Sequence, residues 1–155
     1  MNAAPRRITN ETLTLACGEG SHGVSAELDA QGWALSPKLL SDAECDGITG
    51  LCGSSEAFRS RVVMARHGFV QVAVLLSEPD EDFQGGEFVL TEQRPRMQSR
   101  ASVVPLRKGD AVVFAVNSRP VRGARGEYRV NLRHGVSQVR AGHRHTLGLI
   151  FHDAA

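Results

Sequence analysis

The sequence predicts a mainly β protein, a sandwich or barrel of short strands with a helix near its N-terminus. Short apolar or alternating runs recur between residues 70 and 151, and turn residues separate them. The chain contains 16 glycines, which indicates many tight turns. Clear helix-start signals occur at one place, near residue 41.

A chain of 155 residues is long enough to bury a hydrophobic core and short enough to form one domain. Residues 1–25 are polar and glycine-rich, and we expect them to be a flexible segment that precedes a single domain at 26–155. No apolar run approaches the roughly 18 residues of a membrane span, and the first residues resemble no signal peptide. The three cysteines have no metal-ligand spacing. These features predict a cytoplasmic protein with reduced thiols and no membrane partner.

The net charge of +1 conceals an uneven distribution along the chain. Residues 1–93 hold 6 basic against 14 acidic residues, whereas residues 94–145 hold 12 basic residues against Asp110 and Glu127 only. A basic C-terminal half is suited to an anionic partner, nucleic acid included. The alternative is that the acidic half neutralises it within the fold, or that the arginines lie on solvated strand faces.

The N-terminal part predicts a short helix or turn at residues 26–32 and a strand at 32–37. Ser41 and Glu44 have the spacing of a capping box, so a helix is expected from there to about Leu51. One buried face of this helix would carry Cys45, Ile48 and Cys52.

The C-terminal part predicts most of the sheet. Residues 70–77 form a near-continuous apolar run, which is typical of a strand buried on both faces. Further strands are expected at 87–92, 101–106 and 111–116, with a turn at 107–110 and a long basic loop at 117–127. Two final runs, 128–136 and 144–151, flank a short glycine-containing turn.

His134 and Arg144 are the sharpest candidates for chemistry. Each lies on one of the two final runs, and we expect these runs to pair as neighbouring strands joined by the turn at 140–143. Both side chains would then face one side of a sheet, where a histidine holds a metal and an arginine holds an acid that chelates it. Asp110 and Glu87 are the acids expected beside Arg144 when no such ligand is bound.

The segment HGVSQVRAGHR, from His134 to Arg144, resembles a motif of the iron(II)- and 2-oxoglutarate-dependent dioxygenases. GGEF at 85–88 and GDAVVF at 109–114 precede it in the order found in that family. The resemblance extends over residues 27–153 and is strongest to a bacterial, prolyl-hydroxylase-like branch that includes predicted oxidative DNA demethylases.

The resemblance implies a double-stranded β-helix, that is, a cupin-like jelly roll with a short N-terminal helical cap. It also implies Fe(II) and 2-oxoglutarate as cofactors. By the same resemblance His134 is a metal ligand and Arg144 is the cofactor-binding residue for the distal carboxylate of 2-oxoglutarate. No residue is assigned a separate catalytic role.

The sequence departs from this family at the other two iron ligands, which relatives supply as H-x-D. No H-x-D occurs in the chain. At the corresponding offset stand Arg59 and Arg61, which do not bind Fe(II), while His67 is followed by Phe69 in the place of the acid. We therefore expect an internal deletion near residues 69–70, an incomplete jelly roll, and an exposed sheet edge through which a homodimer could form.

Two functional classes follow. The first is an oxygenase that performs hydroxylation or oxidative demethylation, impaired because two of three iron ligands are absent. The second is a non-catalytic β-domain that binds an anionic ligand or nucleic acid through its basic C-terminal half. A peptidyl residue, a small molecule and an alkylated nucleic-acid base all remain open as substrates.

Overall fold

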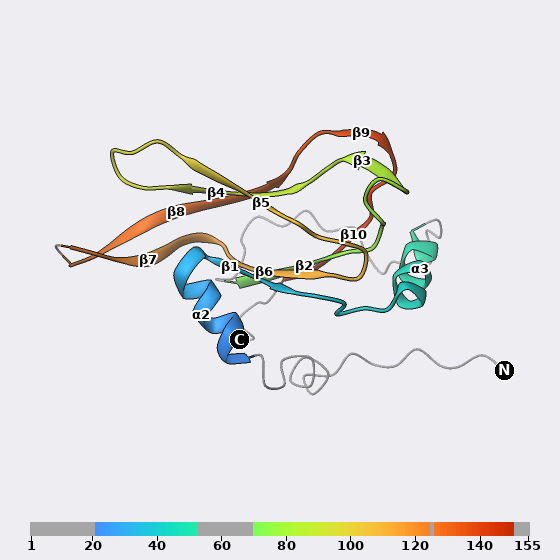
Figure 1. Cartoon of the computed structure of the whole chain (residues 1–155), viewed down its shortest axis with the longest axis horizontal. Coiled ribbons are helices and arrows are strands. Elements are labelled where there is room, and N and C mark those ends of the chain that lie inside the picture. Colours follow the sequence, from blue (N-terminus) through green and yellow to red (C-terminus); the bar gives the residue numbers. More distant parts are fainter. Residues whose placement is uncertain (1–20, 53–69, 125, 151–155) are drawn as a thin grey trace.

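The computed structural model describes residues 21–52, 70–124 and 126–150, which form two facing antiparallel sheets (Figure 1). The β2 sheet has the strand order β1 (Trp33–Ser36), β6 (Ala111–Ala115), β2 (Val70–Leu75) and β10 (Thr146–Ile150). The β8 sheet has the order β5 (Arg100–Val104), β4 (Phe88–Gln93), β8 (Gly126–Val136) and β7 (Asn117–Gly123). A two-stranded ribbon, β3 (Phe83–Gly85) with β9 (Val139–Gly142), lies at one end, and the helices are α2 (Ser21–Gln31) and α3 (Asp42–Leu51).

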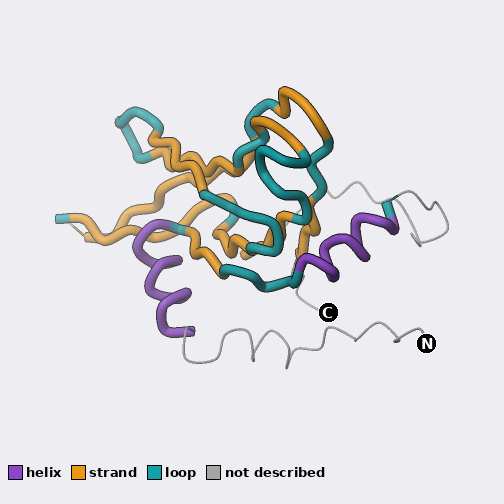
Figure 2. The backbone as a smooth tube through the Cα atoms, turned by 45° about the vertical axis from the view of Figure 1, so that its right-hand side comes forward, coloured by secondary structure: helices purple, strands orange, loops and turns teal. Residues whose placement is uncertain are grey.

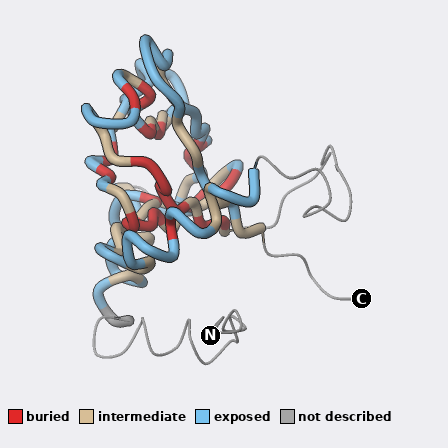
Figure 3. The backbone as a smooth tube through the Cα atoms, turned by 90° about the vertical axis from the view of Figure 1, so that its right-hand side faces the viewer, coloured by how far each residue is buried: buried red, intermediate tan, exposed pale blue. Residues whose placement is uncertain are grey.

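This arrangement confirms the predicted fold class, a mainly β, jelly-roll-like fold with two helices in the N-terminal part of the described chain (Figure 2). The main core lies between the two sheets, and Figure 3 shows buried stretches there and exposed segments at the periphery. The core cluster consists of Leu75, Phe83, Phe88, Leu90, Val104, Leu106, Val112, Phe114 and Val116. No helix in the described residues is long and apolar enough to cross a membrane.

Strand β2 accounts for the near-continuous apolar run of the sequence. It lies between β6 and β10 within the sheet, and each of its faces packs on a hydrophobic cluster. Leu75 points into the core between the sheets, whereas Val72 and Val74 point to a second cluster on the other face. Cys45 of α3 belongs to that second cluster, so the helix packs on the outer side of the β2 sheet. A strand with two buried faces has apolar residues at nearly every position rather than at alternate ones.

The capping box at the start of α3 is confirmed. The Ser41 backbone N–H donates to the Glu44 carboxylate at 2.9 Å, and the Glu44 N–H donates to the Ser41 hydroxyl at 3.4 Å. Cys45 is fully buried and Ile48 packs beside it, as expected. The prediction for Cys52 was wrong: its side chain is exposed, because the helix ends at Leu51 and Cys52 is the C-cap beyond the packed face.

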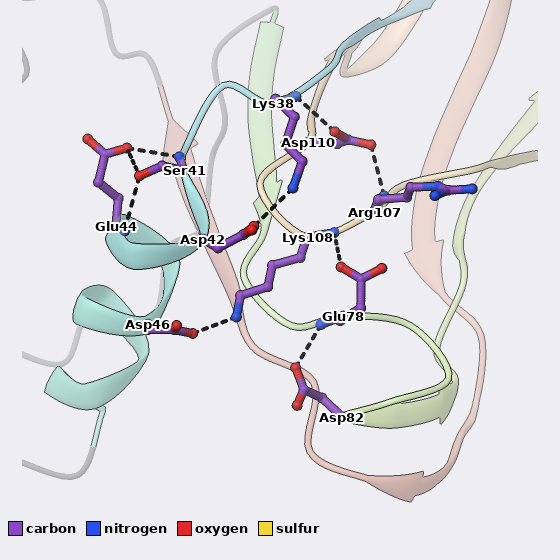
Figure 4. Close-up of polar contacts among 10 residues, drawn as sticks. All are labelled: Lys38, Ser41, Asp42, Glu44, Asp46, Glu78, Asp82, Arg107, Lys108 and Asp110. Carbon is purple, nitrogen blue, oxygen red and sulfur yellow. Dashed lines mark hydrogen bonds and ion pairs between the residues drawn. The ribbon is translucent and has the colours of Figure 1, made fainter.

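Asp110 ties two loops together beside α3 (Figure 4). Its buried carboxylate accepts the backbone N–H of Lys38 at 2.8 Å and that of Arg107 at 2.9 Å. Lys108 of the same turn forms an ion pair with Asp46 of α3. The turn predicted at 107–110 is therefore present, and its acid has a structural role.

One expectation about an irregular segment was wrong. The basic stretch predicted as a loop at 117–127 is instead β7 and the start of β8, paired in a hairpin. Pro120 is compatible with β7 because this strand is at the edge of the sheet in the described part of the chain, where proline is tolerated. The predicted flexible segment 1–25 overlaps α2, which begins at Ser21; residues 1–20 lie outside the described residues.

Arg119 of β7 points inward and joins three elements. One of its guanidinium nitrogens donates to the Asp29 carbonyl at 2.6 Å, and the other donates to the Ala30 carbonyl at 3.0 Å and to the Glu92 carboxylate at 2.7 Å. The two carbonyls belong to the last turn of α2, where backbone acceptors have no partner within the helix. Arg119 is only 7% exposed, and its hydrogen bonds connect the end of α2 to the β8 sheet in the interior of the fold.

The predicted deletion near residues 69–70 was expected to leave an exposed sheet edge. In the described part of the chain β10 pairs with β2 alone, so it forms one edge of the β2 sheet. Phe69 and the segment around it, including Arg59, Arg61 and His67, lie outside the described residues. Dimer formation through an exposed edge stays a prediction.

Candidate functional site

Arg144 lies just before β10 and faces the layer between the two sheets. The register of β10 places Thr146 opposite Leu75, whose side chain is in the core cluster. Arg144, two residues earlier, lines a cavity of about 180 Å³ in the same layer. Its walls combine apolar and charged residues: Leu75, Phe83, Gly86, Phe88, Val104 and Leu106 together with Asp80, Glu87 and Arg140.

The guanidinium of Arg144 has few polar contacts for a half-buried cation. It donates to the Thr146 hydroxyl and lies 5.8 Å from the centre of the Phe83 ring, within the range of a cation–π interaction. Its Nε is buried and has no hydrogen-bond partner among the described residues. Burial lowers the pKa of Arg144 from its usual value, but an arginine stays protonated in proteins. The cavity therefore contains a positive charge with donors available to an anion.

The two glycines of the GGEF segment make room for this side chain. Gly86 has φ of +66°, and a Cβ there would lie 2.9 Å from Cδ of Arg144 and 3.0 Å from the Val139 side chain. Gly85 has φ of +73°, and its Cβ would lie 2.3 Å from the Gln138 carbonyl oxygen. Sterics therefore explain the two glycines of the motif. Both positions have a left-handed backbone, and other atoms lie where a Cβ would be.

Replacing Gly86 with alanine is expected to displace Arg144 and to lower stability. The left-handed conformation costs about 1–2 kcal/mol for a residue with a Cβ, and the new methyl group would push against the arginine stem. Urea denaturation would measure the free energy of unfolding, and the quenching of a bound anionic probe would report on the cavity. Gly23→Ala is the control, because a Cβ at Gly23 meets nothing within 4 Å. Equal stability of both variants would contradict this role.

His134 faces the same layer from the opposite sheet. It lies opposite Leu90 in the β4–β8 register and shares the inward face of β8 with Val130 and Leu132. Its ring centre is 4.6 Å from that of Phe114 and 6.3 Å from that of Phe88, and it stacks on Phe88 with an interplanar angle of 14°. Phe88 also lines the cavity of Arg144, so one aromatic ring contacts both regions.

The expected pairing of the two final strands was wrong. β8 pairs with β4 and β7, whereas β10 pairs with β2 in the facing sheet. Between them the chain forms β9, which pairs with β3 and ends at Gly142, where φ is +76°. A Cβ at Gly142 would lie 2.1 Å from the Asp82 carbonyl oxygen, so this glycine lets the chain cross tightly from one sheet to the other. His134 and Arg144 thus face one layer from two sheets rather than one side of a single sheet.

Neither acid expected beside Arg144 forms an ion pair with it. Asp110 accepts backbone N–H groups on the far side of the β2 sheet. Glu87 accepts a hydrogen bond from the Ser137 hydroxyl, which holds the pKa of Glu87 below its usual value. The contacts that stabilise Arg144 are instead Phe83 and Thr146, which sequence reasoning missed. Thr146 could have been predicted as a partner of Arg144, because residues two apart in an extended segment share one face.

The described residues do not complete an iron centre of the expected type. A centre with two histidines and one carboxylate needs three converging donors, and the described ranges contain no group of three His, Cys, Asp or Glu side chains placed to hold a metal ion. The ring of His134 lies beside the rings of Phe88 and Phe114. Arg144 and its cavity, by contrast, fit a carboxylate.

Comparison with known proteins gives the family. Residues 61–154, more than half of the chain, match the Oxygenase-NA family, described as an oxygenase catalysing oxidative methylation of damaged DNA. Two proteins of Mycobacterium tuberculosis, uncharacterized protein MT2286 (strain CDC 1551 / Oshkosh) and uncharacterized protein Rv2227 (strain ATCC 25618 / H37Rv), are each 51% identical over 86 residues. The match covers 56% of this chain but 37% of each relative, so the chain spans little more than a third of their length. On the match to residues 61–154, the chain belongs to the Oxygenase-NA family of oxygenases.

Proposed function

We propose that this chain is an oxygenase domain that binds 2-oxoglutarate through Arg144, with turnover impaired because its Fe(II) site is incomplete. The observation that carries the proposal is the guanidinium of Arg144, which is half-buried in a cavity and retains a buried, unpartnered Nε among the described residues. Family membership supports the oxygenase class. The dependence on 2-oxoglutarate and Fe(II) rests on the motif from His134 to Arg144.

A carboxylate is the ligand that best suits this cavity. Removing a cation from water costs free energy unless an anion or several hydrogen bonds compensate it. The planar guanidinium binds a carboxylate through two parallel hydrogen bonds, while the apolar part of the wall, Leu75, Phe83 and Phe88 among it, would cover the methylene groups of a small dicarboxylate. At about 180 Å³ the cavity suits a small molecule rather than a polymer.

Binding of 2-oxoglutarate tests the proposal directly. We expect isothermal titration calorimetry to detect 1:1 binding of 2-oxoglutarate and no binding of its uncharged diethyl ester, since the ester cannot accept the charged hydrogen bonds. Succinate release, measured with Fe(II), ascorbate and candidate substrates, would report on turnover. The absence of any 2-oxoglutarate binding, with the protein folded, would refute the proposal.

The metal is expected to bind weakly. His134 offers one nitrogen, and affinity depends on the number and geometry of ligands. We expect a Kd for Mn(II), measured by electron paramagnetic resonance, of about 1 mM or weaker, which corresponds to roughly 4 kcal/mol. His134→Ala should change this value little. Stoichiometric binding at micromolar Mn(II) that His134→Ala abolishes would show that other residues complete the centre.

The substrate class follows from the family description and remains part of the proposal. Damaged DNA in that description favours an alkylated base over a peptidyl residue or a small molecule. The alternative function, a non-catalytic domain that binds an anion, is favoured by the excess of basic residues at 94–145. Bound 2-oxoglutarate without succinate release in the presence of alkylated DNA and Fe(II) would support that alternative.

A further inference from the structure

The outer face of the β8 sheet presents a row of basic and polar side chains. On β8 Val130 and Leu132 are buried, so the alternate residues Arg129, Asn131 and Arg133 point outward, and all three are exposed. Successive side chains on one face of a strand are about 7 Å apart. The two arginines are therefore about 14 Å apart along one straight strand.

The neighbouring strand extends this row. Arg122 of β7 is exposed and lies opposite Glu127, on the same outer face. Two nitrogens of the Arg129 guanidinium donate to the Ser118 hydroxyl, at 2.9 and 3.2 Å, which holds this cation over β7. In the described part of β4, β7 and β8 the outward charges are three arginines and Glu127, and none of the three arginines is in an ion pair within 4.0 Å among the described residues. We define the basic face as Arg122, Arg129 and Arg133 with the outward residues between them.

We propose that the basic face binds the sugar–phosphate backbone of a nucleic acid. It lies on the opposite side of the β8 sheet from the cavity of Arg144, so it would act as a docking surface separate from that cavity. Regularly spaced arginines match a polymer with regularly spaced phosphates, and binding would release counterions. This surface goes beyond the proposed function and does not depend on 2-oxoglutarate.

The chemistry between the arginines favours a nucleic acid over a membrane. The outward residues beside them include Asn131, Ser118 and Thr91, whose side chains donate hydrogen bonds to phosphate and sugar oxygens. Within the described parts of β4, β7 and β8 the outward positions hold no Trp, Phe, Tyr or Leu, the residues that insert into a lipid interface. A hollow of about 310 Å³ adjoins Arg133, where Gly135 leaves open space beside the cation.

Salt dependence of DNA binding gives a quantitative test. Fluorescence anisotropy with a labelled duplex would be measured between about 50 and 200 mM salt, comparing the full chain with the double variant R129Q/R133Q. Because each phosphate contact contributes about 0.9 to the slope of log K against log salt, the slope should fall by about 1.8 and the affinity at the lowest salt by tenfold or more. The matched control is R107Q/R140Q, which removes two exposed arginines outside this face and should leave the slope unchanged.

Several outcomes would overturn the proposal. One is equal slopes for R129Q/R133Q and R107Q/R140Q. Another is displacement of the duplex by polyglutamate as effective as by unlabelled DNA, which would show attraction to any polyanion. Tighter binding to phosphatidylserine vesicles than to DNA would assign the face to a membrane. R129Q/R133Q should keep its affinity for 2-oxoglutarate, and Arg144→Ala should keep its affinity for DNA, so failure of one function is distinguishable from failure of the other.

Discussion

Replacing Arg144 with alanine is expected to weaken 2-oxoglutarate binding at least a hundredfold. The variant would lose a charge-assisted, two-point contact to a half-buried cation, which is worth about 3 kcal/mol; about 1.4 kcal/mol corresponds to a tenfold change in Kd. Calorimetric titration with 2-oxoglutarate gives the comparison. The fold should be retained, because the guanidinium has one hydrogen-bond acceptor, Thr146, among the described residues and otherwise lies over the Phe83 ring and beside Gly86.

Two further variants distinguish the contribution of the guanidinium geometry to 2-oxoglutarate binding from the contribution of positive charge. Arg144→Lys keeps the positive charge but loses the planar fork, so its affinity should lie between those of the wild type and Arg144→Ala. Arg122→Ala removes an equal charge from the distant β7–β8 hairpin and should bind 2-oxoglutarate normally. Similar losses for Arg122→Ala and Arg144→Ala would mean that overall charge, not this cavity, attracts the ligand.

Replacing Arg119 with alanine is expected to lower the free energy of unfolding by about 3–5 kcal/mol, the usual cost of removing one partner from a buried ion pair. The change would leave the Glu92 carboxylate in the interior with only Arg94 as an ion-pair partner. It would also leave the Asp29 and Ala30 carbonyls at the end of α2 without their donor. Urea denaturation followed by far-UV circular dichroism would measure the loss, and Arg122→Ala, exposed on the same strand, should change stability little.

The pH dependence of stability gives a second readout of the same pair. Burial by itself raises the pKa of Glu92, but hydrogen bonds from Arg94 and Arg119 outweigh it and the pKa lies below its usual value. A carboxyl with a lowered pKa in the folded state stabilises the fold above its unfolded pKa of about 4.3 and loses this contribution as pH falls through the folded pKa. Part of the acid sensitivity below pH 4.3 should therefore disappear in R119M/E92L. An Arg119→Ala variant as stable as Arg122→Ala would show that the ion pair contributes nothing net.

Sequence reasoning predicted those elements whose signals are local. The capping box of Ser41 and Glu44 predicted the start of α3, and the near-continuous apolar run of β2 indicated a strand with two covered faces. The segment at 117–127 was misread because arginines, a proline and glycines are typical of loops. They are tolerated in β7 because it is an edge strand, and its place in the sheet depends on partners distant in sequence.

The sequence by itself determined the mainly β class, the helix start at Ser41, and His134 and Arg144 as the residues to examine. Only the tertiary structure decided that these two residues face one layer from opposite sheets, because strand pairing depends on long-range contacts that no local pattern encodes. It also decided that Gly86 leaves space for the Arg144 side chain. Arg119 likewise proved to be a buried residue that connects α2 to the β8 sheet rather than a surface charge. An arginine looks the same in sequence on either face of a strand; its neighbours across the sheet determine whether it binds a ligand, stabilises the fold or contacts solvent.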